Sequence, residues 1–365
     1  MLKRYFISFL LFIFSIYLYA QTPKYSNEFM SIGVGARALG MSNANVAIVN
    51  DVTSGYWNPA GLSLTPSSVQ IALMHSEYFA GIAKYDYGAI SARIDATSTL
   101  GFTFIRFGID DIPDTSELID SEGNINYDKI KSFSSADYGF LFSYSKKSYF
   151  EGFRYGANAK IIHRKAGDFA NAWGFGFDIG AQYDINNWKF GVLGKDITST
   201  FNAWSFDLND KMKETFSITG NEIPENSLEV TLPQLILGVG KKINIYHKKI
   251  YSLIATDFNL TFDGQRNVLV SDKTINIDPR IGIELSYNDF LFVRGGICNI
   301  QNETDITGKK FKTFQPNLGI GIKIKNILTI DYALTDIGNT SIALYSNVFS
   351  LKFNINKISV SSFEL

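Results

Sequence analysis

Cysteine is nearly absent from this chain of 365 residues, because Cys298 stands alone. A single cysteine cannot form an internal disulfide, so no disulfide framework holds the fold together, and it says little about the cellular compartment. An excess of one charge is also missing, since 34 Lys and Arg face 35 Asp and Glu. Domains that bind nucleic acid normally carry a clear basic excess, so we expect no nucleic-acid partner.

Motifs that carry chemistry are missing as well. Three histidines occur, without the spacing of metal ligands: His75, His163 and His247. No nucleophile elbow of the form G-x-S-x-G is present. Gly33, Gly35 and Gly40 superficially suggest a phosphate-binding loop, but position 38 is Ala and no strand precedes them. We therefore expect no catalytic residue, no metal ligand and no cofactor, and we expect that the protein is not an enzyme.

Long apolar runs are missing apart from one at the N-terminus. Lys3 and Arg4 precede an apolar stretch over residues 5–18, and Ala20 stands before the expected cleavage point. The stretch is shorter than the roughly 18–20 residues that a transmembrane helix needs, so it predicts a signal peptide over residues 1–20. The alternative is an uncleaved N-terminal anchor.

Aromatic residues and glycine are abundant, with 30 Phe, 19 Tyr and 30 Gly. From residue 68 onward, apolar side chains alternate with small or polar ones, which predicts strands with one apolar and one polar face. These runs are nearer the ~9–11 residues of a tilted membrane strand than the ~5–6 of a soluble β-sandwich, which is the alternative. Fourteen runs are found, at 68–75, 84–94, 97–109, 136–146, 153–165, 173–184, 188–197, 231–241, 249–260, 277–287, 289–299, 314–325, 327–336 and 343–355.

The lengths of the connections tend to alternate along the chain. Short turns follow the even-numbered strands, at 95–96, 147–152, 185–187, 242–248, Asn288 and Asn326. Most of the other connections are longer, at 110–135, 198–230, 261–276 and 300–313, with shorter exceptions at 166–172 and 337–342. A transmembrane barrel has short turns at one rim and long loops at the other, and lipid requires that its sheet closes.

The sequence therefore predicts an all-β fold, a 14-stranded antiparallel transmembrane β-barrel over residues 68–355 with a C-terminal tail at 356–365. A barrel of fourteen strands is too wide for its side chains alone to fill. We expect the N-terminal periplasmic or plug segment, residues 21–67, to occupy the lumen. Three tryptophans suit the aromatic girdles of such a barrel: Trp57, Trp173 and Trp188.

Within the plug segment the sequence resembles a known family. The stretches at 29–41, 47–52 and 56–62 look like the N-terminal signature of the PorV/PorQ family, outer-membrane barrels of Bacteroidetes that are similar to FadL. The residues of this signature are Gly33, Gly35, Arg37, Gly40, Asp51, Trp57, Asn58, Pro59 and Gly61. Because charges inside a barrel mouth need partners, we also expect Arg37, Asp51 and Asn58 to form a polar network that holds the segment.

The resemblance implies a Gram-negative outer-membrane protein that assists type IX secretion or surface-protein assembly. It would be surrounded by outer-membrane lipid and would bind the translocon or the C-terminal domains of cargo through its outer loops. The loops at 110–135 and 198–230 are the candidate docking surfaces, with Phe201, Trp204 and Phe206 as apolar anchors. The alternative is a FadL-like channel for uptake or export of hydrophobic small molecules, which the same plug would serve.

Overall fold

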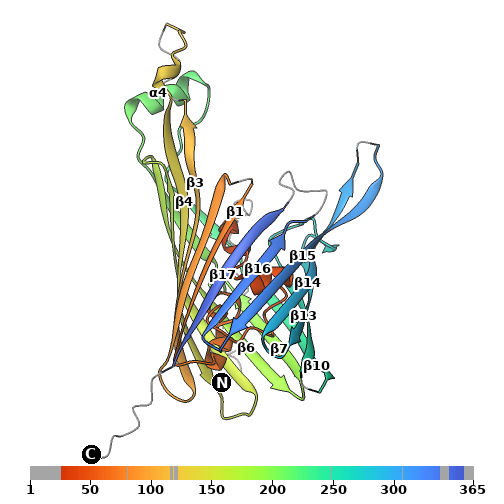
Figure 1. The fold of residues 1–365 in the computed structure, drawn as a ribbon. Coiled ribbons are helices and arrows are strands. Elements are labelled where there is room, and N and C mark those ends of the chain that lie inside the picture. Colours follow the sequence, from red (N-terminus) through yellow and green to blue (C-terminus); the bar gives the residue numbers. More distant parts are fainter. Residues whose placement is uncertain are drawn as a thin grey trace, which may run out of the picture.

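The computed structural model describes residues 26–79, 81–115, 118, 122–247, 249–305, 307–337 and 345–356. The predicted signal peptide, and the predicted tail beyond residue 356, lie outside these residues. Within the described part, seventeen strands form one antiparallel sheet. Its closure comes from β1 (Val69–Tyr78), which pairs on one side with β2 (Ala83–Arg93) and on the other with β17 (Ser346–Ile355), as Figure 1 shows.

Fourteen of these strands make the barrel wall. Those between β2 and β17 are β3 (Ser98–Asp114), β4 (Lys131–Lys147), β5 (Phe153–Ala166), β6 (Ala170–Ile185), β7 (Trp188–Lys195), β10 (Gln234–Tyr246), β11 (Ile250–Thr261), β13 (Asn276–Tyr287), β14 (Leu291–Thr304), β15 (Lys310–Ile324) and β16 (Leu328–Thr335). Three short strands extend the sheet: β8 (Thr200–Phe206) pairs with β6, β9 (Ser227–Thr231) pairs with β8, and β12 (Val270–Ser271) pairs with β13. The predicted fourteen-stranded antiparallel barrel is confirmed.

Side chains alternate between the outside and the inside of the wall. On β6, the rings of Trp173, Phe175 and Phe177 are exposed, whereas Asp178 and the intervening glycines are buried. The outer surface is therefore apolar and the inner surface is small or polar, the reverse of a soluble protein. Because the wall closes, each of its fourteen strands pairs with a neighbour on both sides, as a sheet in apolar surroundings requires.

The two rims differ as the connection lengths predict. At one rim, Asn186 and Asn187 join β6 to β7 with φ values of 48° and 70°, the conformation of a tight hairpin that Asn tolerates. At the other rim, β3 and β4 continue beyond the predicted strands, and β8, α4 (Asp210–Ile218) and β9 follow β7.

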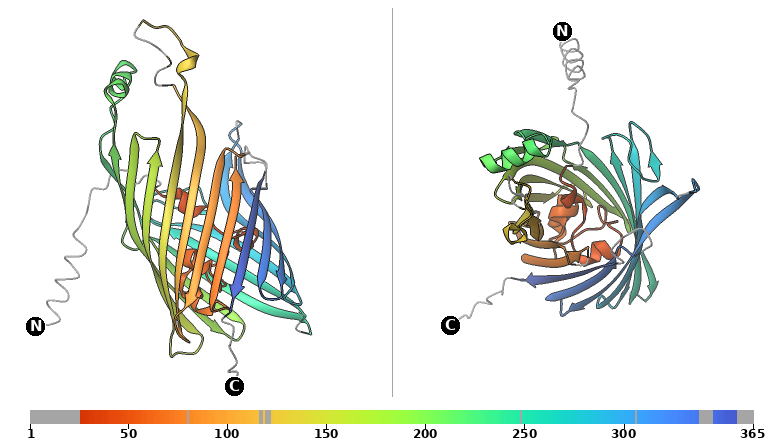
Figure 2. Two further views of the ribbon diagram at one scale, coloured as in Figure 1. Left: turned by 60° about the vertical axis from the view of Figure 1, so that its left-hand side comes forward. Right: turned by 90° about the horizontal axis from the view of Figure 1, so that it is seen from above.

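The β3–β4 hairpin and the segment with β8, α4 and β9 rise above the barrel on the same side as two separate projections, which together we call the tall extension (Figures 1 and 2). Parts of the loops expected at 110–135 and 198–230 are therefore regular: β3 reaches Asp114, β4 begins at Lys131, and β8, α4 and β9 lie in the second range. The physical reason is that hairpin pairing satisfies the backbone N–H and C=O groups beyond the barrel as well as within it.

The barrel encloses residues 26–68, which we call the luminal segment (Figure 2). It contains four short helices: η1 (Glu28–Ser31), α2 (Ala36–Gly40), α3 (Ser54–Trp57) and η2 (Pro59–Leu64). It begins at the tall rim, where Asn27 Nδ2 donates to Thr231 Oγ1 at 2.9 Å, and ends at the other rim, where Arg93 donates to the Thr65 carbonyl. No helix in the described part of the chain has the length and apolar character to span a membrane.

Candidate functional site

Glycines on the inner wall bring the luminal segment unusually close to the strands. A side-chain carbon at Gly191 would lie 2.5 Å from the Val46 carbonyl oxygen, and one at Gly282 would lie 2.4 Å from that of Met41. Both positions therefore require glycine, because the wall and the backbone of the segment are in contact there. Other wall glycines face the segment in the same way: Gly101, Gly139, Gly156, Gly180, Gly238, Gly240, Gly296 and Gly319.

The predicted glycines of the segment itself serve its folding and packing. Gly33 and Gly35 have φ values of 103° and 82°, which other residues rarely adopt. A carbon added at Gly40 would lie 2.9 Å from Cα of Gly319, so α2 touches the wall. A carbon added at Gly61 would lie 2.4 Å from a backbone oxygen of the segment. These positions shape the segment and its contact with the wall.

Charged side chains join α2 to the wall. Arg37 Nε donates to Glu284 Oε2 on β13 at 2.9 Å, and its Nη2 donates to the other carboxylate oxygen at 3.1 Å. Glu284 also accepts a hydrogen bond from Arg294 Nε on β14 at 2.7 Å. The side chains of Glu284 and Arg294 are each 2% exposed. Charges this deeply buried require opposite charges and hydrogen bonds, which these pairs supply.

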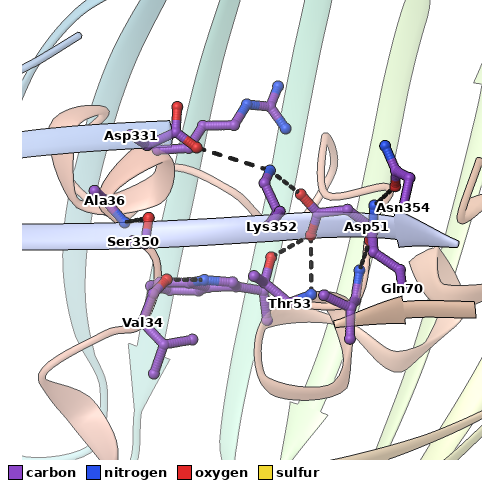
Figure 3. A network of polar contacts seen from close by, with 12 residues as sticks. Val34, Ala36, Asp51, Thr53, Gln70, Asp331, Ser350, Lys352 and Asn354 are labelled. Atoms are coloured by element: carbon purple, nitrogen blue, oxygen red, sulfur yellow. Dashed lines mark hydrogen bonds and ion pairs between the residues drawn. The ribbon is translucent and has the colours of Figure 1, made fainter. Parts of the chain in front are cut away.

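The ion pairs continue along the wall to a second point of the segment (Figure 3). Arg294 Nη1 donates to Asp331 at 2.7 Å, and Asp331 lies 4.0 Å from Nζ of Lys352 on β17. Lys352 donates to Asp51 at 2.6 Å. Burial raises the pKa of Asp51, but the charges of Lys352 and Arg37 outweigh this effect and hold the pKa at about 2. We call these six linked residues the ionic chain: Arg37, Glu284, Arg294, Asp331, Lys352 and Asp51.

Asn58 lies against a different part of the wall. Its Nδ2 donates to the carbonyls of Val46 and Ala181 at 3.1 and 3.2 Å, and its Oδ1 accepts from the N–H of Ala60. The last bond caps η2, which begins at Pro59 as helices commonly do. The structure therefore links Arg37 with Asp51 through wall residues, whereas Asn58 is not part of the ionic chain.

The tryptophans predicted for the aromatic girdles occupy two different environments. Trp173 and Trp188 lie exposed on the outer face of β6 and β7. Trp57 is instead buried within the luminal segment, where its Nε1 donates to the Val34 carbonyl at 2.9 Å. The girdle prediction for Trp57 is wrong, because its indole N–H is satisfied inside the barrel and its ring fills the core of the segment.

The predicted docking residues all lie on β8 at the tall rim. Phe201 is 38% exposed on its outer face. Trp204 stacks on Phe206 with ring centroids 6.1 Å apart, and the Arg164 guanidinium lies 5.1 Å from the Trp204 ring. Phe201 is the most exposed of the three, and its ring contacts that of Phe175 on β6, with centroids 5.9 Å apart.

A cavity of about 420 Å³ opens at the tall rim, and we call it the mouth cavity. Its apolar lining comes from the luminal segment, β1, β3 and the turn after β1: Phe29, Ile32, Leu39, Tyr78, Phe79 and Phe107. Its polar lining comes mainly from β14 to β17, including Cys298, Gln315, Asn317 and Ser346. An apolar pocket with a few polar groups on one side is a usual form for a small-molecule site.

A second cavity, of about 430 Å³, lies on the other side of η1 and is polar. Arg266, Arg280 and several carboxamide side chains line it, and Glu28 lines both cavities. Between the segment and the wall, two smaller spaces of about 10 and 30 Å³ are large enough for only one or two water molecules. Within the described residues, no three His, Cys, Asp or Glu side chains are grouped as metal ligands.

Known proteins match this chain in structure only. No model of a protein family matches it, and no curated protein matches it in sequence. The toluene transporter TodX of P. putida aligns with a TM-score of 0.56 and 14% identity, over 89% of this chain and 99% of TodX. The monoaromatic hydrocarbon channel CymD aligns with a TM-score of 0.53 and 11% identity, over 89% and 98% of the two chains.

At these identities the likeness shows the fold. The chain has the closed, fourteen-stranded barrel of these proteins, and such a barrel points to the outer membrane of a Gram-negative bacterium. The similar structures are transport channels and not enzymes. The comparisons do not single out the PorV/PorQ family within this fold.

Proposed function

We propose that the protein is an outer-membrane channel that takes hydrophobic small molecules at the mouth cavity, the alternative that the sequence left open. The carrying observation is the composition of this cavity, because half of its apolar lining belongs to the luminal segment. A molecule bound there contacts the segment that fills the lumen below it. TodX and CymD, whose fold the chain shares, are hydrocarbon channels, which supports the proposal.

Passage through the barrel requires the luminal segment to shift. Two spaces between the segment and the wall have room for only one or two waters, and the wall glycines bring the strands into contact with the segment. The segment therefore acts as a plug, and the ionic chain fastens it to β13, β14, β16 and β17. A ligand would open the path only if it binds the shifted arrangement more tightly than the closed one.

Ligand binding tests the proposal directly. The full barrel in a nonionic detergent should bind uncharged 1-naphthalenemethanol saturably, measured from the ligand's fluorescence. Ile32→Trp should weaken binding at least tenfold, because a larger ring in the luminal segment fills the cavity, while Ile355→Trp on the outer face should not. Equal binding by both variants, or no binding by the wild type, would show that the mouth cavity is not the entry site.

A second candidate function is protein docking at the tall extension, which its exposed apolar side chains favour. Phe201 on β8 is joined there by Leu228 and Val230 on β9, which are 56% and 38% exposed. Apolar side chains that project beyond a barrel are typical of contacts with another protein. An accessory role in type IX secretion in Bacteroidetes, with the translocon or cargo domains as partners, is the specific form that the N-terminal resemblance implies.

Purification in mild detergent separates the two candidate functions. Recovery of a large translocon or a surface protein with the wild type, and its loss with Phe201→Ser, would favour docking. A lone barrel that carries lipid would favour the channel. The outward apolar rings, such as Phe177, are proposed to contact outer-membrane lipid in either case.

A further inference from the structure

The mouth cavity carries charge of only one sign. Among the residues that line it, Glu28 and Asp336 are charged, and no Lys or Arg is present. Glu28 lies 3.7 Å from Arg266 of the neighbouring cavity, so part of its charge is compensated. Asp336 forms no ion pair within the described part of the chain; it accepts hydrogen bonds from Gln315 and from Thr335 Oγ1. Asp336 is therefore the principal charge that a ligand in this cavity meets.

Four aromatic residues line the same space. Phe29 belongs to the luminal segment, Tyr78 ends β1, Phe79 lies in the turn after it, and Phe107 comes from β3. The Tyr78 and Phe79 rings are 6.5 Å apart and tilted by 52°, so they present their faces in different directions. The face of an aromatic ring carries partial negative charge and attracts cations, and aromatic cages of this kind recognise organic ammonium groups.

We propose that the mouth cavity selects hydrophobic organic cations, such as arylalkyl amines and quaternary ammonium compounds, over carboxylates of equal size. This inference rests on the proposed function and names the class of ligand that its entry site takes. An ammonium group is attracted by the carboxylate of Asp336 and by the faces of the aromatic rings. A carboxylate in the same place meets a like charge and finds no cation in the lining.

Three ligands that share one ring system test this selectivity. The full barrel in nonionic detergent at pH 7 is titrated with 1-naphthylmethylamine, 1-naphthalenemethanol and 1-naphthoate, which are cationic, uncharged and anionic. We expect the amine to bind at least about tenfold more tightly than the carboxylate, from the combined ring and carboxylate attraction. Asp336→Asn should reduce this ratio at least threefold, and Phe107→Leu should weaken the amine more than the alcohol.

Asp336→Asn keeps the local backbone, because φ is 59° at this residue and Asn tolerates that region as well as Asp does. Asp168→Asn is the matched control, since this carboxylate is fully exposed at the same rim and makes the same change in net charge. It should leave the ratio unchanged. An equal effect of both variants would mean that general surface charge attracts the amine, and would overturn the inference.

The remaining outcomes separate this inference from the proposed function. If the alcohol binds saturably and the naphthoate binds as tightly as the amine, the selectivity is refuted while the hydrophobic entry site stands. If none of the three ligands binds, the proposed function fails, and the inference fails with it.

Discussion

Removal of Lys352 should destabilise the barrel strongly. Its ammonium lies between Asp51 of the luminal segment, at 2.6 Å, and Asp331 of the wall, at 4.0 Å. The Asp51 and Lys352 side chains are 8% and 13% exposed, so Lys352→Met leaves a buried carboxylate without its main partner. Breaking a buried pair from one side costs about 3–5 kcal/mol of unfolding free energy.

The assay is urea unfolding of the barrel in lipid vesicles, followed by tryptophan fluorescence. Lys323→Met is the matched control, because Lys323 pairs with Asp289 at the same kind of distance, 2.7 Å, but the carboxylate is 58% exposed. Such a surface pair contributes only about 0–1 kcal/mol. In the double variant Asp51→Asn with Lys352→Met, both charges are removed, and much of the lost stability should return.

Equal unfolding midpoints for Lys352→Met and Lys323→Met would refute the reasoning, since they would mean that the ionic chain does not hold the luminal segment. A double variant that is less stable than either single variant would show that the two residues act independently, and would also contradict the account.

Three further predictions follow from the contacts between the segment and the wall. Arg37→Ala should cost less than Lys352→Met, about 2 kcal/mol, because its wall carboxylate keeps a second arginine; an unchanged temperature of the heat-induced gel shift would disprove its anchoring role. Gly282→Ala should lower the free energy of unfolding by about 1–3 kcal/mol, because the added carbon presses on the backbone of the segment. Gly295→Ala should leave it unchanged in the same assay, because the atom nearest to its added carbon is 3.7 Å away. The pKa of Asp51 falls from 3.8 to about 2 on folding, so its stabilising contribution should be complete above about pH 4 and disappear as the pH falls toward 2; a loss already at pH 5 would contradict this.

The barrel could be predicted from the sequence because its main signals are local. Alternation along each strand and the parity of the connection lengths depend on neighbouring residues alone, and fourteen strands follow from them. The ends of β3 and β4 were less predictable, since a hairpin in water needs no apolar outer face. The ordered tall extension was missed for the same reason.

The partners of the ionic chain could not be predicted because they depend on register. Glu284 and Arg294 are charged residues on the inward face of apolar strands, and this signal is visible in the sequence. Only the pairing of β13 with β14 places them directly opposite each other. Asp331 and Lys352 come together diagonally across β16 and β17, which alternation alone does not specify.

The inner glycines have a clearer role in the structure than the sequence allowed. Their alternation predicts an inner face of small side chains, which is correct, but it does not predict what occupies the space beside them. Positions such as Gly191 and Gly282 turn out to follow the path of the luminal segment around the wall. Trp57 was misplaced for a related reason, because composition does not distinguish a ring at the membrane surface from one inside the barrel.

The most direct test of the channel is a reversible lock on the luminal segment. Ala36 N donates to Ser350 Oγ at 3.0 Å, so the segment and β17 are in contact at these two residues (Figure 3). The lock is a disulfide engineered between cysteines at these two positions, with Cys298→Ser, and a gel shift on reduction verifies that it has formed. The measurement is uptake of radiolabelled toluene by cells that have no other hydrocarbon channel. We predict uptake above the empty-vector level for the wild type, loss in the oxidised double-cysteine variant, and recovery after reduction. Uptake that equals the empty vector, or that continues at full rate with the disulfide formed, would contradict a channel opened by movement of the plug.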